Sequence, residues 1–424
     1  MSMTIDIEKH NIHLLYADKN NHFFKLANNI YPIKSFQNYI CISMHIFLFR
    51  KNYCFKKIFI TMKKRLSSSV LTLIIFFTFF SCRQDISGED IEIINDINLE
   101  NLIFSSHEPN EYQLKQINRK YGMFIHFSIN TFHNEEWTDG TKPANTYNPT
   151  DVDAKQWVET AQKAKMKYII LVAKHHDGFC LWDSKYTKYD VANSGNTTNV
   201  VQKVAEECGR HGIGLGLYYS LWDMKQNENV ADSTLNELYN RYILAQLNEL
   251  ISIVQKHTPL IELWLDGGWV KPNYCWPLAE IYRDVKERAP QCQIGVNWSI
   301  GLPGDPDKHL VLPTEQKEGY PIRYFPSDFR LGDPFLPANP DPKLFTHDGK
   351  TYYMPWESTV CISNKWFFNE EDSAYKSIKE LAEIYTHATA QDNIFILNTP
   401  PNREGRLRDQ DVQILLDLCN YLNL

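Results

Sequence analysis

Six stretches with strand character each end in polar or aromatic side chains that can hydrogen-bond to a ligand. The clearest is Leu260–Trp269 (LIELWLDGGW), in which an apolar run meets Asp266 and then two glycines. Asp is a poor strand former and Gly-Gly ends a strand, so the run delivers a carboxylate to the end of a buried strand. Trp264 and Trp269 flank it, and flat aromatic faces suit the C–H faces of a sugar ring. A buried Asp that caps a turn is the alternative interpretation of this stretch.

The other five strand ends carry histidines, tyrosines, an amide and a carboxylate. They are His126, Lys174–Phe179 (KHHDGF), Tyr218-Tyr219, Asn297-Trp298 and Trp356-Glu357. In a parallel barrel, the carboxyl ends of the strands face the loops that form the active site. We therefore predict that these groups meet at one rim.

Three histidines, His126, His175 and His176, could hold a metal ion or bind a hydroxylated ligand. Adjacent side chains on a strand point to opposite faces, so His175 and His176 could share an ion only if the backbone bends between them. No H-x-H or HExxH spacing occurs. A neutral imidazole donates through one nitrogen and accepts through the other, which suits sugar hydroxyls. We expect no metal and no cofactor, with a metal-dependent barrel hydrolase as an alternative.

From about Ser105 the chain alternates between strand and helix patterns, which is typical of a parallel α/β fold. We expect strands at 123–127, 168–173, 213–219, 261–265, 293–297, 352–357 and 394–398, and helices at 153–165, 199–211, 233–257, 278–288, 373–391 and 409–422. Seven strands are one short of an eightfold barrel. One is therefore missing, or disguised among residues 299–350, which are dense in Pro, Gly and Asp.

The N-terminal residues have the pattern of a targeting segment. Met62–Arg65 is basic, Val70–Phe80 is apolar but too short to span a bilayer, and Ser81-Cys82 follows. This ending resembles a bacterial lipobox, in which Cys82 would carry the lipid; an ordinary signal peptide is the alternative. We therefore expect an exported lipoprotein that is periplasmic or associated with the outer membrane or cell surface.

These patterns divide the chain into four parts. We interpret residues 1–61 as a spurious extension from an upstream start codon, 62–82 as the lipoprotein signal peptide, 83–104 as a linker and 105–424 as the catalytic barrel. Residues 1–82 carry 11 Lys/Arg against 3 Asp/Glu, whereas the rest carries 33 against 48. Such an acidic body is a poor candidate for nucleic-acid binding. The nine cysteines show no CxxC and signal neither a zinc site nor a disulfide framework.

Several of these motifs together resemble glycoside hydrolase family 29, the α-L-fucosidases. They are GMFIHF at 122–127, KHHDGF at 174–179, the Tyr218 region, WLDG at 264–267 and NIFILNTPPNREGRL at 393–407. The resemblance implies a retaining exo-glycosidase on a somewhat irregular (β/α)8 TIM-type barrel, here without a C-terminal β-sandwich domain. It implies Asp266 as the nucleophile. The residues that it implies for holding the fucose are His126, Glu136, Trp137, His175, His176, Tyr218 and Trp264.

Retaining hydrolysis also needs a second carboxyl group that protonates the leaving oxygen. The segment Ser327–Asp333 resembles a family pattern that would put Asp333 at this position, and Glu357 aligns with another family Glu proposed for the same role. Both stay open as the acid/base residue, with Glu315 and Glu318 as outside candidates. Where many members have Asn-Asp-Arg, this chain reads Asn297-Trp298-Ser299, so Arg323 or Arg330 could replace the sugar-binding Arg.

The leading hypothesis is a lipid-anchored exo-α-L-fucosidase that acts on fucosylated oligosaccharides or glycoconjugates. The alternatives are a retaining glycosidase of the same fold with another sugar specificity, and a catalytically silent glycan-binding lipoprotein. We expect contact with a membrane through the lipid anchor only. The sequence does not predict the oligomeric state.

Overall fold

The computed structural model describes residues 102–103, 105–226, 236–305 and 311–424, together with three short N-terminal strands. These strands, β1 (Ser2–Glu8), β2 (Asn11–Ala17) and β3 (Phe23–Lys25), pair antiparallel in that order. They lie in one unit, Met1–Ile94, and the remaining elements lie in a second, Asn95–Leu424.

The division of the first 104 residues into extension, signal and linker stays a prediction. The signal segment and Cys82 lie outside the described residues, as does nearly all of the linker. Among the described helices, none combines the length and the apolar character needed to cross a membrane.

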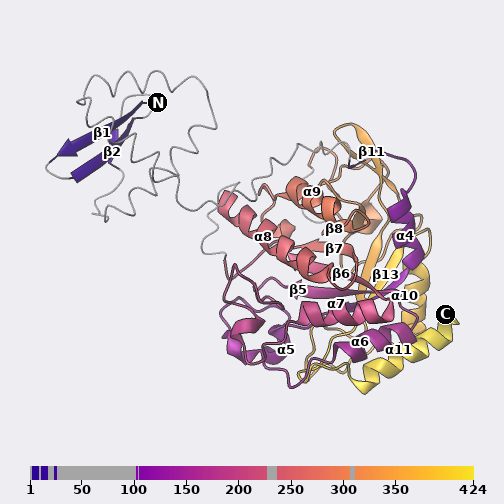
Figure 1. Cartoon of the computed structure of the whole chain (residues 1–424). Coiled ribbons are helices and arrows are strands. Elements are labelled where there is room, and N and C mark those ends of the chain that lie inside the picture. Colours follow the sequence, from indigo (N-terminus) through magenta and orange to yellow (C-terminus); the bar gives the residue numbers. More distant parts are fainter. Residues whose placement is uncertain are drawn as a thin grey trace. The chain divides into compact units, whose positions relative to one another are not determined.

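The second unit is a (β/α)8 barrel of parallel strands with helices around it (Figure 1). The strands are β4 (Tyr121–Ile125), β5 (Tyr168–Lys174), β6 (Gly214–Ser220), β7 (Leu260–Asp266), β8 (Gln293–Asn297), β9 (Phe329–Leu331), β12 (Glu357–Cys361) and β13 (Ile394–Asn398). The longer helices are α4 (Glu111–Arg119), α6 (Ala154–Lys163), α7 (Val200–His211), α8 (Glu237–Val254), α9 (Leu278–Arg288), α10 (Ile378–Ala388) and α11 (Asp409–Leu422). The sheet runs β12-β13-β4-β5-β6-β7-β8-β9, and a single parallel bridge between Arg330 and Trp356 joins its two edges.

Alternate residues of each strand point into the barrel, as the twofold period of a strand requires. Tyr218, Trp264 and Phe329 belong to one apolar cluster inside the barrel, whereas intervening residues such as Leu263 pack in the larger cluster beneath the helices. On β7, Glu262, Trp264 and Asp266 share the inner face. The strand therefore carries one carboxyl group near its amino end and another at its carboxyl end, separated by about 13 Å of extended chain.

Most predicted elements are confirmed, including α9, α11, β8 and β13 at the predicted bounds. Asp153 and Asn199 cap α6 and α7 as their side chains accept hydrogen bonds from the first turn, and Gly212 ends α7 in the left-handed conformation. The eighth strand is β9, three residues long and indeed hidden in the irregular segment after β8.

The strand predicted at 352–357 is wrong. Instead, β10 (Leu344–His347) and β11 (Lys350–Tyr353) form an antiparallel hairpin, and β12 begins only at Glu357. The hairpin turns at Asp348-Gly349, where both residues have positive φ, as a two-residue turn of this kind requires. As a consequence, Glu357 stands at the amino end of its strand and not at the carboxyl end.

Candidate active site

Asp266 lies at the carboxyl end of β7 in a dense set of hydrogen-bond donors. Its Oδ2 accepts from the Tyr218 hydroxyl (2.8 Å), and its Oδ1 accepts from the backbone N–H of Gly267 (2.6 Å), the indole N–H of Trp269 (3.1 Å) and the amide of Asn297 (3.0 Å). Gly267 has a φ of 75°, so its lack of a side chain lets the backbone turn back onto the carboxylate. The two oxygens of Asp266 therefore accept hydrogen bonds from four donors.

The histidines meet at the same rim. The Nδ1 of His126 lies 2.7 Å from the Asn398 side-chain oxygen, and the rings of His175 and His176 are 4.3 Å apart. Both follow the last residue of β5, where the chain leaves the strand, so adjacent side chains can face one pocket. Burial lowers the pKa of all three, to about 3 for His126. These imidazoles are therefore neutral at neutral pH, each with one donor and one acceptor nitrogen.

The tautomer of His176 follows from its neighbours. Its Nδ1 lies 2.7 Å from the Ser220 hydroxyl, which donates its only proton to the Trp222 carbonyl (2.5 Å). Nδ1 must then carry the proton, which leaves the Nε2 lone pair facing the pocket. Nε2 is 3.5 Å from Asp266 Oδ2. A ligand hydroxyl beside Asp266 can therefore donate to His176.

Aromatic rings enclose these groups in a pocket of about 210 Å³. Its apolar lining consists of Phe124, Trp137, Tyr218, Trp264, Trp269, Trp298 and Trp366. Trp137 is 49% exposed, and its ring lies edge to face 5.1 Å from that of His176, at the mouth of the pocket. The volume is below that of a typical site for a drug-sized ligand, and this size suits a single sugar ring.

Asp333 brings a second carboxyl group into the pocket. The Nδ2 atom of Asn297 donates to Asp333 Oδ1 as well as to Asp266 Oδ1. Burial, together with the negative charge of Asp266, raises the pKa of Asp333 to about 7. At neutral pH Asp333 is therefore protonated in a large fraction of molecules.

Glu357, the other candidate acid/base residue, does not lie in this pocket. It accepts a hydrogen bond from the Tyr168 hydroxyl (3.0 Å) at the amino end of β5, and it neighbours Glu262 at the amino end of β7. Asp266 is at the opposite end of β7. The family resemblance suggested Glu357 as the acid/base residue, and the strand predicted at 352–357 placed it at the rim. It lies instead at the amino end of β12, outside the pocket.

The outside candidates are also elsewhere. Glu315 is exposed and accepts from the backbone of Leu312 (3.1 Å), and Glu318 is exposed and accepts from the backbone of Lys343 and Leu344 (2.8 Å each). Both carboxylates hold loops in place, and neither lines the pocket.

Three further predicted residues do not line the pocket. Glu136 accepts from the backbone N–H of Trp366 (2.9 Å), so it positions one wall of the pocket. Arg330 is fully buried in an ion pair with Asp341 (2.7 Å) and cannot replace the missing sugar-binding arginine. Arg323 does not line the pocket.

Six residues that contribute to the site were not singled out in the sequence: Phe124, Ser220, Trp222, Thr359, Trp366 and Asn398. Ser220 and Asn398 are the last residues of β6 and β13, so the pattern of a polar residue at the end of an apolar strand applies to them as well. Trp222 and Trp366 lie in irregular segments, where no periodicity marks them. Within the described ranges, no group of three or more His, Cys, Asp or Glu side chains could hold a metal ion, and all six cysteines found there are free.

Comparison with known proteins points to one family. A sequence model described as Alpha-L-fucosidase matches residues 131–424. Alpha-L-fucosidase 1 of Arabidopsis thaliana is 31% identical over 332 residues, which cover 74% of this chain and 60% of that protein. The chain thus spans about three fifths of the length of this plant relative.

Solved structures share the barrel. The crystal structure of SpGH29 is 26% identical with a TM-score of 0.60, covering 76% of this chain and 71% of that one. Alpha-L-fucosidase AlfC from Lactobacillus casei, in complex with its alpha-L-fucose product, is 21% identical with a TM-score of 0.56, covering 74% of this chain and 98% of that one. At this lower identity, the likeness shows the fold alone.

Proposed function

The chain belongs to the α-L-fucosidase family, and we propose that it is a retaining exo-α-L-fucosidase that removes terminal α-L-fucosyl residues from glycans. The observation that carries this proposal is the pair Asp266 and Asp333, held side by side by Asn297 in a pocket that fits one sugar. The pair supplies a carboxylate and a carboxylic acid, which are the two groups that this hydrolysis requires.

The spacing of the pair supports retention of configuration. Two oxygens that accept from one nitrogen lie within about 6 Å of each other, because neither hydrogen bond exceeds about 3 Å. Retaining glycosidases place their carboxyl groups about 5–5.5 Å apart, whereas inverting ones leave about 6.5–9.5 Å for a water molecule.

In the proposed reaction, Asp266 attacks the anomeric carbon while Asp333 gives its proton to the departing glycosidic oxygen. A covalent fucosyl ester forms on Asp266. Asp333, now ionised, takes a proton from a water molecule as that water attacks the anomeric carbon of the ester. The bond to Asp266 breaks, which releases fucose and restores the Asp266 carboxylate.

The rest of the pocket suits a sugar that is partly apolar. Neutral His126, His175 and His176 offer nitrogens of both kinds to ring hydroxyls. Fucose has a methyl group where galacto-configured sugars carry a hydroxymethyl group, and an apolar wall favours the methyl, though only modestly.

The direct test is turnover of 4-nitrophenyl α-L-fucoside by the full chain, with the first-formed anomer identified by NMR. We expect nitrophenol release and α-fucose as the initial product. No turnover of any aryl fucoside or fucosylated oligosaccharide would sink the proposal. Fucose binding without turnover would instead identify a silent glycan-binding protein, and faster turnover of another glycoside would identify a different specificity.

We further propose that the protein is exported and anchored through a lipid on Cys82. The basic, apolar and Ser-Cys order of residues 62–82 supports this. The test is incorporation of labelled palmitate by the wild type in a bacterial host. A Cys82→Ser variant should lose the label, and retention of the label would contradict the proposal.

A further inference from the structure

A second hollow, of about 530 Å³, lies outside the catalytic pocket and has a different chemistry. Its lining consists of Lys185, Tyr186, Thr187, Lys188, Tyr189, Lys225 and Gln226. Three of these residues are cationic and none is acidic. Residues 83–424 carry more Asp and Glu than Lys and Arg, so the positive charge of this hollow is opposite in sign to the net charge of that part of the chain.

In the part of the chain that the structure describes, none of the three ammonium groups is paired with a carboxylate. Within the described residues, neither Lys185 nor Lys188 forms an ion pair, and the Nζ of Lys225 donates to the Gly140 carbonyl (3.0 Å) and lies 5.1 Å from the centre of the Tyr189 ring. The carboxylate of Asp139, on the same loop as Gly140, accepts from Thr141. The ammonium groups are therefore available to an anion. Nearby carboxylates are engaged elsewhere or act on other residues: Glu249 accepts from the backbone N–H of Lys185 (3.0 Å), and the charges of Asp177, Asp139 and Asp223 act on Tyr189.

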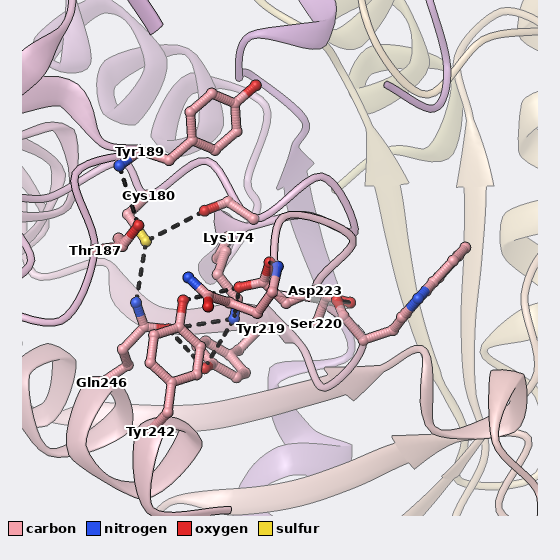
Figure 2. Close-up of polar contacts among 12 residues, drawn as sticks. Lys174, Cys180, Thr187, Tyr189, Tyr219, Ser220, Asp223, Tyr242 and Gln246 are labelled. Atoms are coloured by element: carbon pink, nitrogen blue, oxygen red, sulfur yellow. Dashed lines mark hydrogen bonds and ion pairs between the residues drawn. The ribbon is translucent and has the colours of Figure 1, made fainter. Parts of the chain in front are cut away.

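A buried polar network (Figure 2) anchors residues 223–226, two of which line this hollow. The Nζ of Lys174, fully buried, donates to Tyr219 (3.0 Å), Asp223 (3.0 Å) and Gln246 (3.2 Å). Asp223 also accepts from the Tyr242 hydroxyl (2.8 Å) and from the backbone of Gln226 (3.0 Å), a residue of the hollow. Residues 223–226 are thus hydrogen-bonded to the interior, and this segment carries Lys225 and Gln226.

The same loop joins the hollow to the catalytic pocket. Trp222 packs on the ring of His176, with centroids 5.2 Å apart, and the backbone N–H of Met224 donates to the His176 carbonyl (2.7 Å). Lys225 follows directly. A chain segment of four residues therefore has one end against His176 of the pocket and the other in the cationic hollow.

We propose that this hollow is a binding subsite for an anionic saccharide, a sulfated or carboxylated sugar unit of the glycan whose fucose is removed. Lys185, Lys188 and Lys225 would face the anionic group. Tyr186, 49% exposed, offers an aromatic face to the sugar ring. That the saccharide and the cleaved fucose belong to one glycan rests on the proposed function, whereas binding of the anionic sugar does not.

Calorimetry with the full chain tests the subsite without any fucose. The probes are 3′-sulfolactose, 3′-sialyllactose, neutral lactose and inorganic sulfate. We expect one or both anionic sugars to bind at least tenfold more tightly than lactose and sulfate, and to weaken as NaCl rises from about 0.05 to 0.5 M. The two acidic sugars distinguish a sulfate-binding from a carboxylate-binding site. The proposal would be overturned if neutral lactose bound as tightly as both acidic sugars, or if inorganic sulfate bound as tightly as both.

A matched pair of double variants locates the binding. Lys185→Gln/Lys188→Gln should weaken binding of the anionic sugar about tenfold, since each ammonium group contributes a modest amount at an exposed site. Lys155→Gln/Lys163→Gln changes the net charge equally on α6 and should leave binding unchanged. An equal effect of both variants would overturn the assignment.

Turnover of 4-nitrophenyl α-L-fucoside separates this inference from the proposed function. The Lys185→Gln/Lys188→Gln variant should keep the wild-type rate on this neutral substrate. If the wild type binds the anionic sugar but hydrolyses no fucoside, the proposed function fails and the subsite stands.

Discussion

Asp266 and Asp333 accept hydrogen bonds from the same side-chain nitrogen, the Nδ2 atom of Asn297. Beyond this shared donor their surroundings differ. Asp266 also accepts from Tyr218, Gly267 and Trp269, whereas burial and the charge of Asp266 dominate at Asp333 and raise its pKa to about 7. The two carboxyl groups therefore share a donor but differ in environment, which suits the two different roles that we propose for them.

Replacing Asp266 with Ala should lower kcat on 4-nitrophenyl α-L-fucoside by about 10⁴-fold or more, because no group remains to form the covalent intermediate. Azide should restore activity and give the inverted β-fucosyl azide, identified by NMR. Asp348→Asn, at a largely exposed carboxylate of the β10–β11 turn, is the control and should behave as the wild type. Wild-type activity of Asp266→Ala would exclude this residue as the nucleophile.

Replacing Asp333 with Asn should lower kcat/KM by about 10²–10⁴-fold for a substrate with a poor leaving group, such as methyl α-L-fucoside. The loss should be far smaller for dinitrophenyl fucoside, whose leaving group needs little protonation. In the wild type, kcat/KM should fall as the pH rises through about 7, because Asp333 loses the proton that it must donate. If kcat/KM of the Asp333→Asn variant fell in the same way with rising pH, another group would be the acid.

In the Asn297→Ala variant, the fall of kcat/KM at alkaline pH (the alkaline limb of the profile) should move to higher pH. The Asn297 hydrogen bond opposes the effect of burial and lowers the pKa of Asp333, so its removal lets the pKa rise. Loss of the donor should also reduce kcat about 10–100-fold. The measurement is the pH profile of kcat/KM, with Asn420→Ala on the exposed face of α11 as control. An unmoved or acid-shifted limb would contradict the assignment.

The regular part of the site could be predicted from the sequence. Asp266, His126 and Tyr218 lie within two residues of the carboxyl ends of strands whose apolar runs are continuous, and parallel strands bring such ends together at one rim. The same reasoning would have included Asn398, which ends β13.

The sequence named both Asp333 and Glu357 as candidate acid/base residues and could not separate them, because Asp333 lies in an irregular segment. Asp333 follows β9, a strand of three residues with too little pattern to detect. The pattern predicts a strand that ends at Glu357. The turn at Asp348-Gly349 instead assigns the preceding residues to a hairpin, and Glu357 is the first residue of β12. Local patterns do not show which of two adjoining extended runs enters the barrel.

Lys174→Met should destabilise the fold by about 3–5 kcal/mol, because it leaves the Asp223 carboxylate buried without its cation. Unfolding in urea measures the loss. Lys174→Met/Asp223→Asn should recover part of it, since a neutral amide can still accept from Tyr242. A double variant less stable than the single one would show that the ion pair does not account for the effect. The exposed Lys155→Met is a control and should cost little.

Glu357→Gln should leave catalysis intact and change how stability depends on pH. Burial, together with the nearby charge of Glu262, raises the pKa of Glu357 well above its ordinary value of 4.5. Above that ordinary value the unfolded chain releases a proton that the folded protein retains. The free energy of unfolding therefore falls as the pH rises from about 4.5 towards the folded-state pKa, by up to about 1.4 kcal/mol per pH unit for one proton.

The amide of the Glu357→Gln variant cannot bind this proton, so the variant should lose less stability than the wild type between about pH 5 and pH 8, measured by urea unfolding at several pH values. Glu135→Gln, at a partly exposed carboxylate, should give a curve parallel to that of the wild type. The kcat/KM of Glu357→Gln on 4-nitrophenyl α-L-fucoside should stay within about threefold of the wild type, because a general acid would contribute about 10²–10⁴-fold. A parallel stability curve, or a loss of that size, would restore Glu357 as a catalytic candidate.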